Sequence, residues 1–418
     1  MKKTFAEKIL SNASGEDARA GDIVVVRPDF CMSHENASSV SRTFQKIGLK
    51  KVWDPSRIVI IFDHTVPPST ADYALSQKVT RQFVREQGIT HFYDMNSCGG
   101  ICHQIMCQEG YAVPGAVIVG TDSHTCTHGA FGAFATGIGR SEMAAVWATG
   151  EIWLSVPETI RITVEGTFPK GVCAKDLILR IIGDLGADGA NYKAVEFHGP
   201  AIAAMSMAER MTLCNMAVEY GAKSSACPPD EKTRAAIRGR EKLTGRPAVW
   251  ADRGADYCQE LTYRLEELVP CVARPHTVDN YAPVSEVEGT PIDQAFIGTC
   301  TNARLEDLRI SAAILRGRRV AVRTIVIPAS VEVYRDALRE GLIDIFLAAG
   351  CTLSHPGCGP CIGVSGGCLA EGETVISTAN RNFKGRNGDK SSQIYLASPA
   401  TAAYSAVRGV ISDPRGCL

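Results

Sequence analysis

The sequence predicts an α/β fold, in which helices cover sheets made mainly of parallel strands. Several short apolar runs each end directly in a polar cluster, and helical stretches lie between them. Short continuous apolar runs are typical of strands buried on both faces, and alternating strands and helices indicate parallel sheets. Hydrophobic residues make up 45% of the 418 residues and charged residues 21%, as in an ordinary globular protein.

The elements follow in chain order. Near the N-terminus, Phe5, Ile9 and Leu10 share one face of a predicted short amphipathic helix, and Glu7 and Lys8 interrupt any signal-peptide core, so we expect no export. The predicted strands are 58–62, 116–119, 295–297, 324–327 and 374–376, and the predicted helices are 71–87, 141–154, 305–316 and 332–341.

The polar clusters lie where the chain leaves these strands. Asp63 and His64 follow the first strand, Asp122 and His124 the second, and Cys300 the third. Ligands of open α/β sheets bind beyond the carboxyl ends of the strands. The sequence therefore predicts one active site built from several strand ends.

Two stretches look like changes of structural unit. They are 158–170, which contains Gly166 and Pro169, and a polar, proline-containing stretch near 273–291. We expect three α/β units with boundaries at 1–160, 161–284 and 285–418.

Composition excludes several classes of function. The net charge is −1, so no basic excess is available to hold nucleic acid or an anionic membrane. The apolar runs, such as 58–62, are far too short to span a bilayer. The 16 cysteines, without an export signal, indicate reduced thiols in a cytoplasmic protein, some of them metal ligands.

Three cysteines carry the strongest signal. Cys300 follows a strand, and Cys358 and Cys361 frame a Cys-Gly-Pro-Cys segment. The tetrapeptide also occurs in thiol–disulfide oxidoreductases, and a closed zinc site with Cys351 or Cys368 as fourth ligand fits the spacing. A four-iron cluster held by three cysteines keeps one iron open as a Lewis acid. The position of Cys300 beside other polar candidates favours this third interpretation.

Histidines and arginines supply further candidates. His64, His103 and His124 lie in polar clusters or in the glycine-rich turn 98–103, where Asp63 and Asp122 can orient imidazoles or assist proton transfer. Arg381 and Arg386 suit either the binding of a carboxylate or a solvated basic turn. Asn215 and Glu219 are four residues apart and would share one face of a helix, which is a weaker signal. We expect the remaining histidines of this group to be structural: His128, His198, His276 and His355. The run 137–142 lacks the third glycine of a dinucleotide-binding loop.

Together these residues resemble the aconitase superfamily, most closely the large subunit of the isopropylmalate dehydratase and homoaconitase type. The motifs are Asp63-His64-Thr65-Val66-Pro67, Gly120-Thr121-Asp122-Ser123-His124-Thr125, Gly298-Thr299-Cys300-Thr301-Asn302, Pro356-Gly357-Cys358-Gly359-Pro360-Cys361 and Asn380-Arg381-Asn382-Phe383-Lys384-Gly385-Arg386. They appear in the family's order from near residue 20 to near 412. The resemblance implies three-layer α/β/α units with mainly parallel sheets around a central iron–sulfur site.

The resemblance also implies roles for residues. One [4Fe–4S] cluster per chain would be held by Cys300, Cys358 and Cys361, and its open iron would bind a carboxylate and the departing hydroxyl of a malate-like substrate, a hydroxy di- or tricarboxylic acid. The implied catalytic residues are Asp63, His64, His103, Asp122, Ser123, His124 and Glu219, with His103 as the proton donor. The implied substrate-binding residues are His34, Asn215, Asn380, Arg381 and Arg386.

Full-length aconitases carry a further mobile swivel domain that supplies a serine base and an arginine. This chain ends where that domain would begin, so we expect a separate small subunit and a hetero-oligomeric hydro-lyase. Ala303 stands where isopropylmalate dehydratases usually have glycine, and the segment 34–39 also differs from the usual form. Homoaconitate and dimethylmalate dehydration therefore remain alternatives to isopropylmalate dehydration, and a non-catalytic RNA-binding relative remains a further one.

Overall fold

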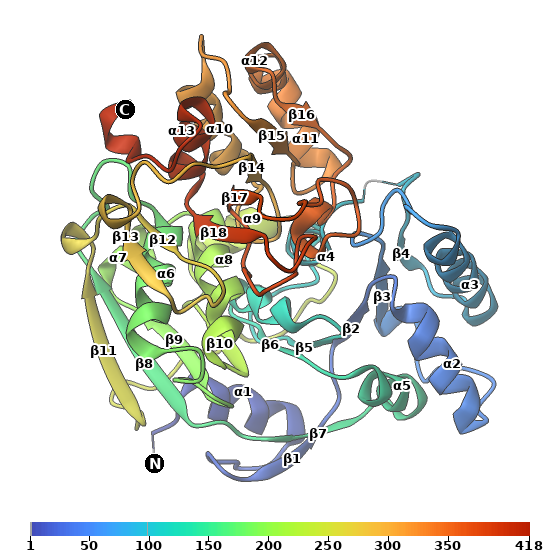
Figure 1. Cartoon of the computed structure of the whole chain (residues 1–418). Helices are drawn as coiled ribbons and strands as arrows, with labels where there is room; N and C mark the ends of the chain where they lie inside the picture. Colours follow the sequence, from blue (N-terminus) through green and yellow to red (C-terminus); the bar gives the residue numbers. More distant parts are fainter. Residues whose placement is uncertain (1, 98) are drawn as a thin grey trace.

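The computed structural model describes residues 2–97 and 99–418. Cys98, which belongs to the glycine-rich turn considered above, lies outside the described residues. Three larger sheets and one two-stranded ribbon form the framework (Figure 1).

The first sheet has five parallel strands in the order β4-β3-β2-β5-β6. Its strands are β2 (Phe30–Ser33), β3 (Ile58–Ile61), β4 (His91–Tyr93), β5 (Val117–Gly120) and β6 (Phe134–Gly137). The strand order changes direction between β2 and β5, and such a switch point opens a crevice beyond the carboxyl ends of the strands. The strands predicted at 58–62 and 116–119 are thereby confirmed as β3 and β5.

Both faces of this sheet are buried. In β3, Ile58 and Ile60 pack into one apolar core and Val59 and Ile61 into another, because successive side chains of a strand point to opposite faces. Residues of α1 (Phe5–Ser14), α2 (Ala37–Ile47), α3 (Ala71–Gln87) and α5 (Arg140–Thr149) build the first core, and α4 (Cys102–Gln108) contributes to the second. The sheet therefore forms the middle of three layers.

One predicted helix needs a correction. The stretch 141–154 is helical only as far as α5 extends, because Gly150 adopts a left-handed conformation with φ 76° and ends the helix. Residues Ile152–Ser155 instead form β7, which pairs antiparallel with β1 (Ile23–Val26) in the small ribbon. The helix predicted at 71–87 is confirmed as α3.

The second sheet has four parallel strands in the order β10-β9-β8-β11. Its elements are β8 (Thr159–Glu165), β9 (Ala194–His198), β10 (Ser224–Ala226) and β11 (Gln259–Arg264), with α6 (Ala174–Leu185), α7 (Pro200–Ala204), α8 (Met207–Met216) and α9 (Glu231–Ile237). Figure 1 shows this green to yellow region beside the first sheet.

The third sheet has seven strands in the order β13-β12-β18-β17-β14-β15-β16, parallel except for the pairings of β12. Its strands are β12 (Cys271–Ala273), β13 (Tyr281–Pro283), β14 (Gln294–Ile297), β15 (Arg323–Val326), β16 (Thr352–Leu353), β17 (Thr374–Ser377) and β18 (Gln393–Ala397). One face carries α10 (Leu305–Leu315), α11 (Val331–Arg339), α12 (Leu342–Ala349) and α13 (Pro399–Arg408). The remaining predicted strands and helices are confirmed here.

The other face of the third sheet turns inward. Phe296, Val375 and Leu396 join a central core to which the first and second sheets also contribute. This shared core brings the carboxyl ends of β3, β5, β14 and β17 toward one another. The residues of β12 and β13 belong to the third sheet although they precede residue 284, and the unit boundaries near 160 and 284 stay predictions.

Among the described residues, no helix has both the length and the apolar character that crossing a bilayer requires.

Candidate active site

A small cavity of about 40 Å³ lies where the first and third sheets face each other. The residues that line it are Asp63, His64, His103, Asp122, His124, Cys300, Cys358, Cys361, Ile362, Asn380, Arg381 and Arg386. All the residues predicted for the site line this cavity except His34, Ser123, Asn215 and Glu219. Motifs almost 320 residues apart in the chain, from Asp63 to Asn380, thus meet in one place.

Cys300 lies in a tight turn after β14. The preceding residue, Thr299, has φ 74°, a left-handed conformation that costs free energy for a residue with a branched side chain. The buried Arg304 donates from Nη2 to the carbonyl of Cys300 and from Nη1 to that of Thr301, both at 2.6 Å. These bonds hold the turn that presents the Cys300 thiol to the cavity.

Cys358 directly precedes the 3₁₀ turn η6 (Gly359–Ile362), and Cys361 lies within it. The amide of Cys358 donates to the carbonyl of Asp63 at 2.8 Å, so the end of β3 holds this turn in place. A Cβ atom on Gly357 would lie 2.8 Å from the same carbonyl oxygen, which is too close. Glycine at this position therefore allows the cysteine turn to approach the first sheet.

Donor groups face the sulfur atoms. Asn380 Nδ2 donates to Cys300 Sγ at 3.2 Å, and Arg386 Nη2 donates to Cys361 Sγ at 3.8 Å. Burial raises the pKa of the Cys300 thiol to about 12 and the pKa of Cys358 well above its usual value. Arg386 Nε is buried and has no hydrogen-bond partner among the described residues. Three buried thiols, two of them faced by nitrogen donors, beside an arginine with a spare N–H, fit an iron–sulfur cluster, which binds thiolates.

The other two metal and thiol hypotheses fit less well. Cys351 and Cys368 do not line the cavity, and within the described part of the chain no fourth cysteine does. Cys368 is exposed and its thiol points to the carbonyl of Gly363. Cys358 and Cys361 are both buried, whereas a reactive dithiol needs an accessible first sulfur.

Asp122 is the centre of a carboxylate–imidazole network. His103 Nε2 lies 2.9 Å from Asp122 Oδ1, and His64 Nε2 lies 3.4 Å from Asp122 Oδ2. Burial works to raise the pKa of Asp122, but hydrogen bonds from His103, His124 and His64 outweigh it and hold this pKa well below its usual value. The carboxylate is therefore anionic and can keep a neighbouring imidazole charged.

The first motif repeats this arrangement. His64 Nδ1 lies 2.6 Å from Asp63 Oδ1, and Asp63 Oδ2 accepts from the amide of Cys102 at 2.7 Å. His64 thus contacts two carboxylates, one at each ring nitrogen. A proton on His64 is stabilised from both sides.

Glu219 and Asn215 stand directly behind the cavity wall. Glu219 accepts from Arg381 Nε at 2.8 Å and lies 2.6 Å from His124 Nε2. Asn215 Oδ1 accepts from Asn380 Nδ2 at 3.2 Å. The structure therefore brings both residues to the site as supports of lining residues rather than as part of the lining.

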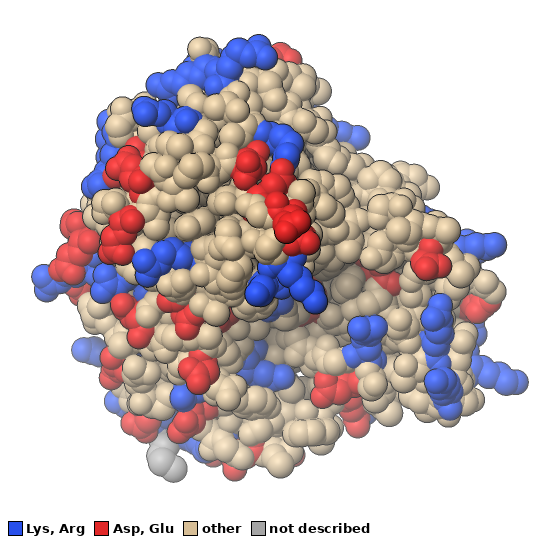
Figure 2. Space-filling view, in the orientation of Figure 1, with Lys and Arg blue, Asp and Glu red and all other residues tan. Residues whose placement is uncertain are grey.

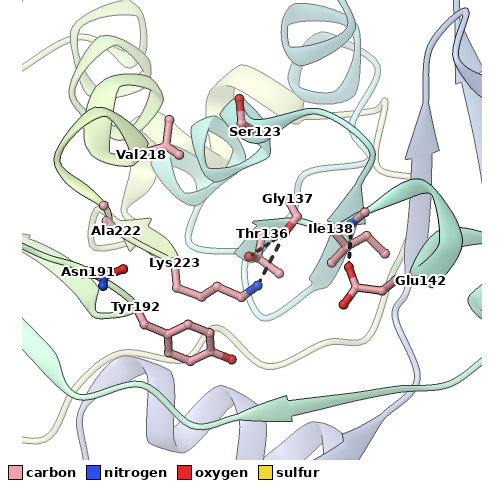
Figure 3. A pocket seen from close by; sticks show the side chains of 12 residues that line it. Ser123, Thr136, Gly137, Ile138, Glu142, Asn191, Tyr192, Val218, Ala222 and Lys223 are labelled. Carbon is pink, nitrogen blue, oxygen red and sulfur yellow. Dashed lines mark hydrogen bonds between the residues drawn. The ribbon is translucent and has the colours of Figure 1, made fainter. Parts of the chain in front are cut away.

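His34 and Ser123 lie further out. The His34 ring stacks on His64 with ring centroids 4.0 Å apart. Ser123 lines a separate surface pocket of about 370 Å³, together with Glu142, Tyr192 and Lys223 (Figure 3). In that view Lys223 points toward Thr136 and Gly137, away from Ser123.

Sequence reasoning missed two supporting residues. Glu35 is buried and accepts from the amides of His64 at 3.2 Å and Thr65 at 2.8 Å. The position of Glu35 next to the candidate His34 in the sequence could have marked it as a site residue. Lys175 is buried against the segment before Asn380, and no pattern in the sequence marks it.

Comparisons with known proteins agree with this geometry. The model of the aconitase family (aconitate hydratase) matches residues 7–290 and 284–409. The chain is 53% identical to 3-isopropylmalate dehydratase large subunit 1 of Methanopyrus kandleri, covering 100% of both chains. It is 54% identical to a probable methanogen homoaconitase large subunit of Methanosarcina mazei, covering 93% of this chain and 98% of that one.

A solved structure shares the fold of this chain. Aconitase X of Thermococcus kodakaraensis matches with a TM-score of 0.55 at 12% identity, covering 96% of this chain and 94% of that one. At this identity the likeness concerns the fold alone, which is a mixed α/β fold with mainly parallel sheets. The family-model match covers nearly the whole chain, and the resemblance expected from the motifs is confirmed: the chain belongs to the aconitase family.

Proposed function

We propose that the chain is the large, catalytic subunit of an iron–sulfur hydro-lyase that dehydrates and rehydrates a substituted malate. The observation that carries this proposal is the meeting of three buried cysteines, a histidine–carboxylate network and two arginines in one cavity. Relatives about half identical over nearly the full chain are named 3-isopropylmalate dehydratase and homoaconitase large subunits, which supports the same class of reaction.

The cofactor is one [4Fe–4S] cluster held by Cys300, Cys358 and Cys361. When bound, such a cluster supplies a Lewis acid that makes hydroxide a better leaving group. The protein contributes the remaining requirements, which are proton supply, substrate orientation and exclusion of water.

Proton supply falls to the histidines of the first sheet. His103 is 2% exposed, so its Nε2, which lies against Asp122, is shielded from bulk water. A charged imidazole there can deliver a proton to a departing hydroxyl, and Asp122 stabilises the charge. His64 has the same type of environment, with Asp63 and Asp122 as partners.

Orientation falls to the arginines. Arg381 uses Nε for Glu219, which leaves its terminal nitrogens for a ligand, and Arg386 keeps a spare buried N–H. Paired N–H groups match the geometry of a carboxylate. These two residues would therefore hold a carboxylate of a hydroxy di- or tricarboxylic acid.

A small subunit of the swivel type would complete the site, as the large-subunit names of the relatives imply. It would supply the serine base and an arginine, and we expect it to contain much of the selectivity for the malate substituent. Homoaconitate and 2,3-dimethylmalate therefore remain alternatives to isopropylmalate. We expect a cytoplasmic enzyme, since all the described cysteines are free.

An RNA-binding role has less support. Figure 2 shows Lys, Arg, Asp and Glu intermixed over most of the visible face, with one group of basic side chains along its upper edge. Nucleic-acid binding depends on clustered positive charge.

The test is anaerobic purification followed by reconstitution with the small subunit from the same source. We expect brown protein with about four irons per chain and dehydratase activity only in the mixture. Colourless protein with one zinc would refute the cluster, and activity of the isolated chain would refute the two-subunit proposal. Assays against malates with different 2- and 3-substituents then identify the substrate.

A further inference from the structure

Lys175 is a fully buried lysine at the second position of α6. Its Nζ donates to the carbonyls of Thr378 at 2.8 Å and Ala379 at 2.7 Å. No carboxylate of the described residues lies within ion-pair distance of it. It is therefore a buried cation whose direct contacts are neutral.

Such a placement is costly. A buried ammonium loses its hydration, and the positive end of the helix dipole at the start of α6 adds to the cost. Arg210, which is equally buried, shows the usual solution, because its guanidinium forms an ion pair with Asp230 at 2.5 Å. Lys175 lacks this compensation, so a negative charge elsewhere is needed to offset it.

The site contributes one of the groups whose negative charge favours the protonated lysine, Cys300. Burial lowers the pKa of Lys175 to about 8, and negative charge on Cys173, then on Cys300, opposes this shift. Thiolates at Cys300, Cys358 and Cys361 would add negative charge that the present contacts of Lys175 do not provide. At a given distance, electrostatic interactions are stronger in a dry interior than in water.

Lys175 also supports the contact between Asn380 and Cys300. The two carbonyls it binds directly precede Asn380, whose Nδ2 donates to Cys300 Sγ and to Asn215. The adjacent Asp176 accepts from the amide of Cys271 at 3.0 Å, so the start of α6 is fastened to the third sheet at two points. Movement of Lys175 would be transmitted to Asn380 and Arg381.

We propose that Lys175 is a positioning residue whose ammonium group offsets the negative charge of the three-thiolate centre and holds the backbone that presents Asn380 to Cys300. This inference rests on the proposed function, since it requires a cluster at the three cysteines.

The experiment compares Lys175→Arg, Lys175→Gln and Lys175→Met in the anaerobically reconstituted chain. The measurements are the reduction potential of the cluster, its electron paramagnetic resonance spectrum and the rate of iron loss to a chelator. Lys175→Met should shift the potential to a more negative value and accelerate iron loss by about 10- to 100-fold, the range seen when groups that support metal ligands are replaced. Lys175→Gln should shift the potential similarly, and Lys175→Arg should stay closer to wild type because it keeps the charge.

Lys232 provides a matched control. Its Nζ also donates to consecutive carbonyls, those of Ala203, Ala204 and Met205, but it lies on the surface and does not line the cavity. Lys232→Met should leave the potential, spectrum and iron loss unchanged. In the complex with the small subunit, Lys175→Met should lower kcat more than it raises KM.

The outcomes separate the two proposals. If the wild-type chain takes up no cluster, the proposed function fails. If the wild-type chain takes up a cluster and Lys175→Met has the same potential, spectrum and iron loss, the inference about Lys175 is wrong even though the function stands. A change in thermal stability alone, without a change in the cluster, would also overturn it, because that is the result for a purely structural lysine.

Discussion

The two halves of the cavity are built from different chemistry. In the half that comes from the first sheet, each of His64, His103 and His124 has a carboxylate partner. In the half that comes from the third sheet, the sulfurs of Cys300 and Cys361 face nitrogen donors, and Arg386 Nε has no partner among the described residues. The histidine half pairs imidazoles with carboxylates, whereas the cysteine half brings together thiols and N–H groups without an acidic partner for Arg386 Nε among the described residues.

This difference indicates a division of labour. Paired imidazoles and carboxylates hold and move protons. Buried thiols with N–H groups directed at them stabilise a metal cluster, because hydrogen bonds to sulfur tune its charge. The two halves should therefore respond differently to substitution, and four predictions test that.

The largest effect is expected in the cysteine half. Cys300→Ser, Cys358→Ser or Cys361→Ser should each abolish cluster retention and activity, since three ligands leave none to spare. Iron analysis and the visible spectrum after anaerobic reconstitution measure this. Cys351→Ala and Cys368→Ala are the controls and should keep about four irons. Equal iron loss in a control variant would show that the cavity does not define the ligand set.

The next largest effect lies in the histidine half. His103→Asn should lower kcat by about 10²- to 10⁴-fold while iron content stays at the wild-type level, since a general acid contributes about this much. Steady-state kinetics with the small subunit present, paired with iron analysis, provide the measurement. Replacement of the half-buried His91, which does not line the cavity, should leave kcat and iron content unchanged. Loss of iron in His103→Asn would break the division of labour proposed here.

A smaller effect is expected for carboxylate binding. Arg386→Lys keeps the positive charge but loses the planar pair of donors and the spare Nε–H. We expect a loss of about 1.5–3 kcal/mol, or about 10- to 100-fold in kcat/KM. An unchanged KM would argue against substrate contact, and a change in the cluster spectrum would place the role of Arg386 at Cys361 instead.

The smallest effect concerns pH and Lys175, which lies against the backbone that precedes Asn380. The folded chain holds the pKa of Lys175 at about 8, below that of an unfolded lysine. In the cluster-free chain, its buried charge destabilises the fold fully below pH 8, and this penalty disappears as pH rises from about 8 toward about 10.4. Cys173, Cys300, Asp176 and Asp307 are the charged or titratable groups that face it.

The measurement is denaturant unfolding of cluster-free wild type and Lys175→Gln across this pH range. The stability of wild type relative to the variant should rise with pH between about 8 and 10.4, because the unfolded wild type binds more protons there. A pH-independent difference would mean that the folded chain binds the Lys175 proton as strongly as the unfolded chain does, so that the pKa of Lys175 is not lowered by burial.

Much of the fold was predictable because local patterns agree with it. The run Ile58–Ile61 is apolar and β-branched and is buried on both faces, so its strand follows from composition alone. The helix predicted at 141–154 was wrong at its end, because the apolar segment after Gly150 pairs with β1. A pairing between residues so far apart in the chain leaves no local pattern in the sequence.

The site was predictable to the extent that its residues sit in short motifs at strand ends. Asp63, Asp122, Cys300 and Asn380 all follow predicted strands and all reach the cavity. Ser123 was harder, since it is adjacent to Asp122 in the motif yet lines another pocket. Neighbouring residues in a turn point in different directions, and motif membership does not tell which.

The sequence alone determined the kinds of chemistry present: thiols for a metal, imidazoles with carboxylates for protons, and arginines for an acid, each at the end of a predicted strand. Tertiary structure decided which of these groups meet. It separated Ser123 from the cavity, placed Glu219 and Asn215 behind it, and buried Lys175 beneath Asn380. The physical reason is that strand and helix propensities are local, whereas the packing of three sheets around one core depends on contacts between distant segments.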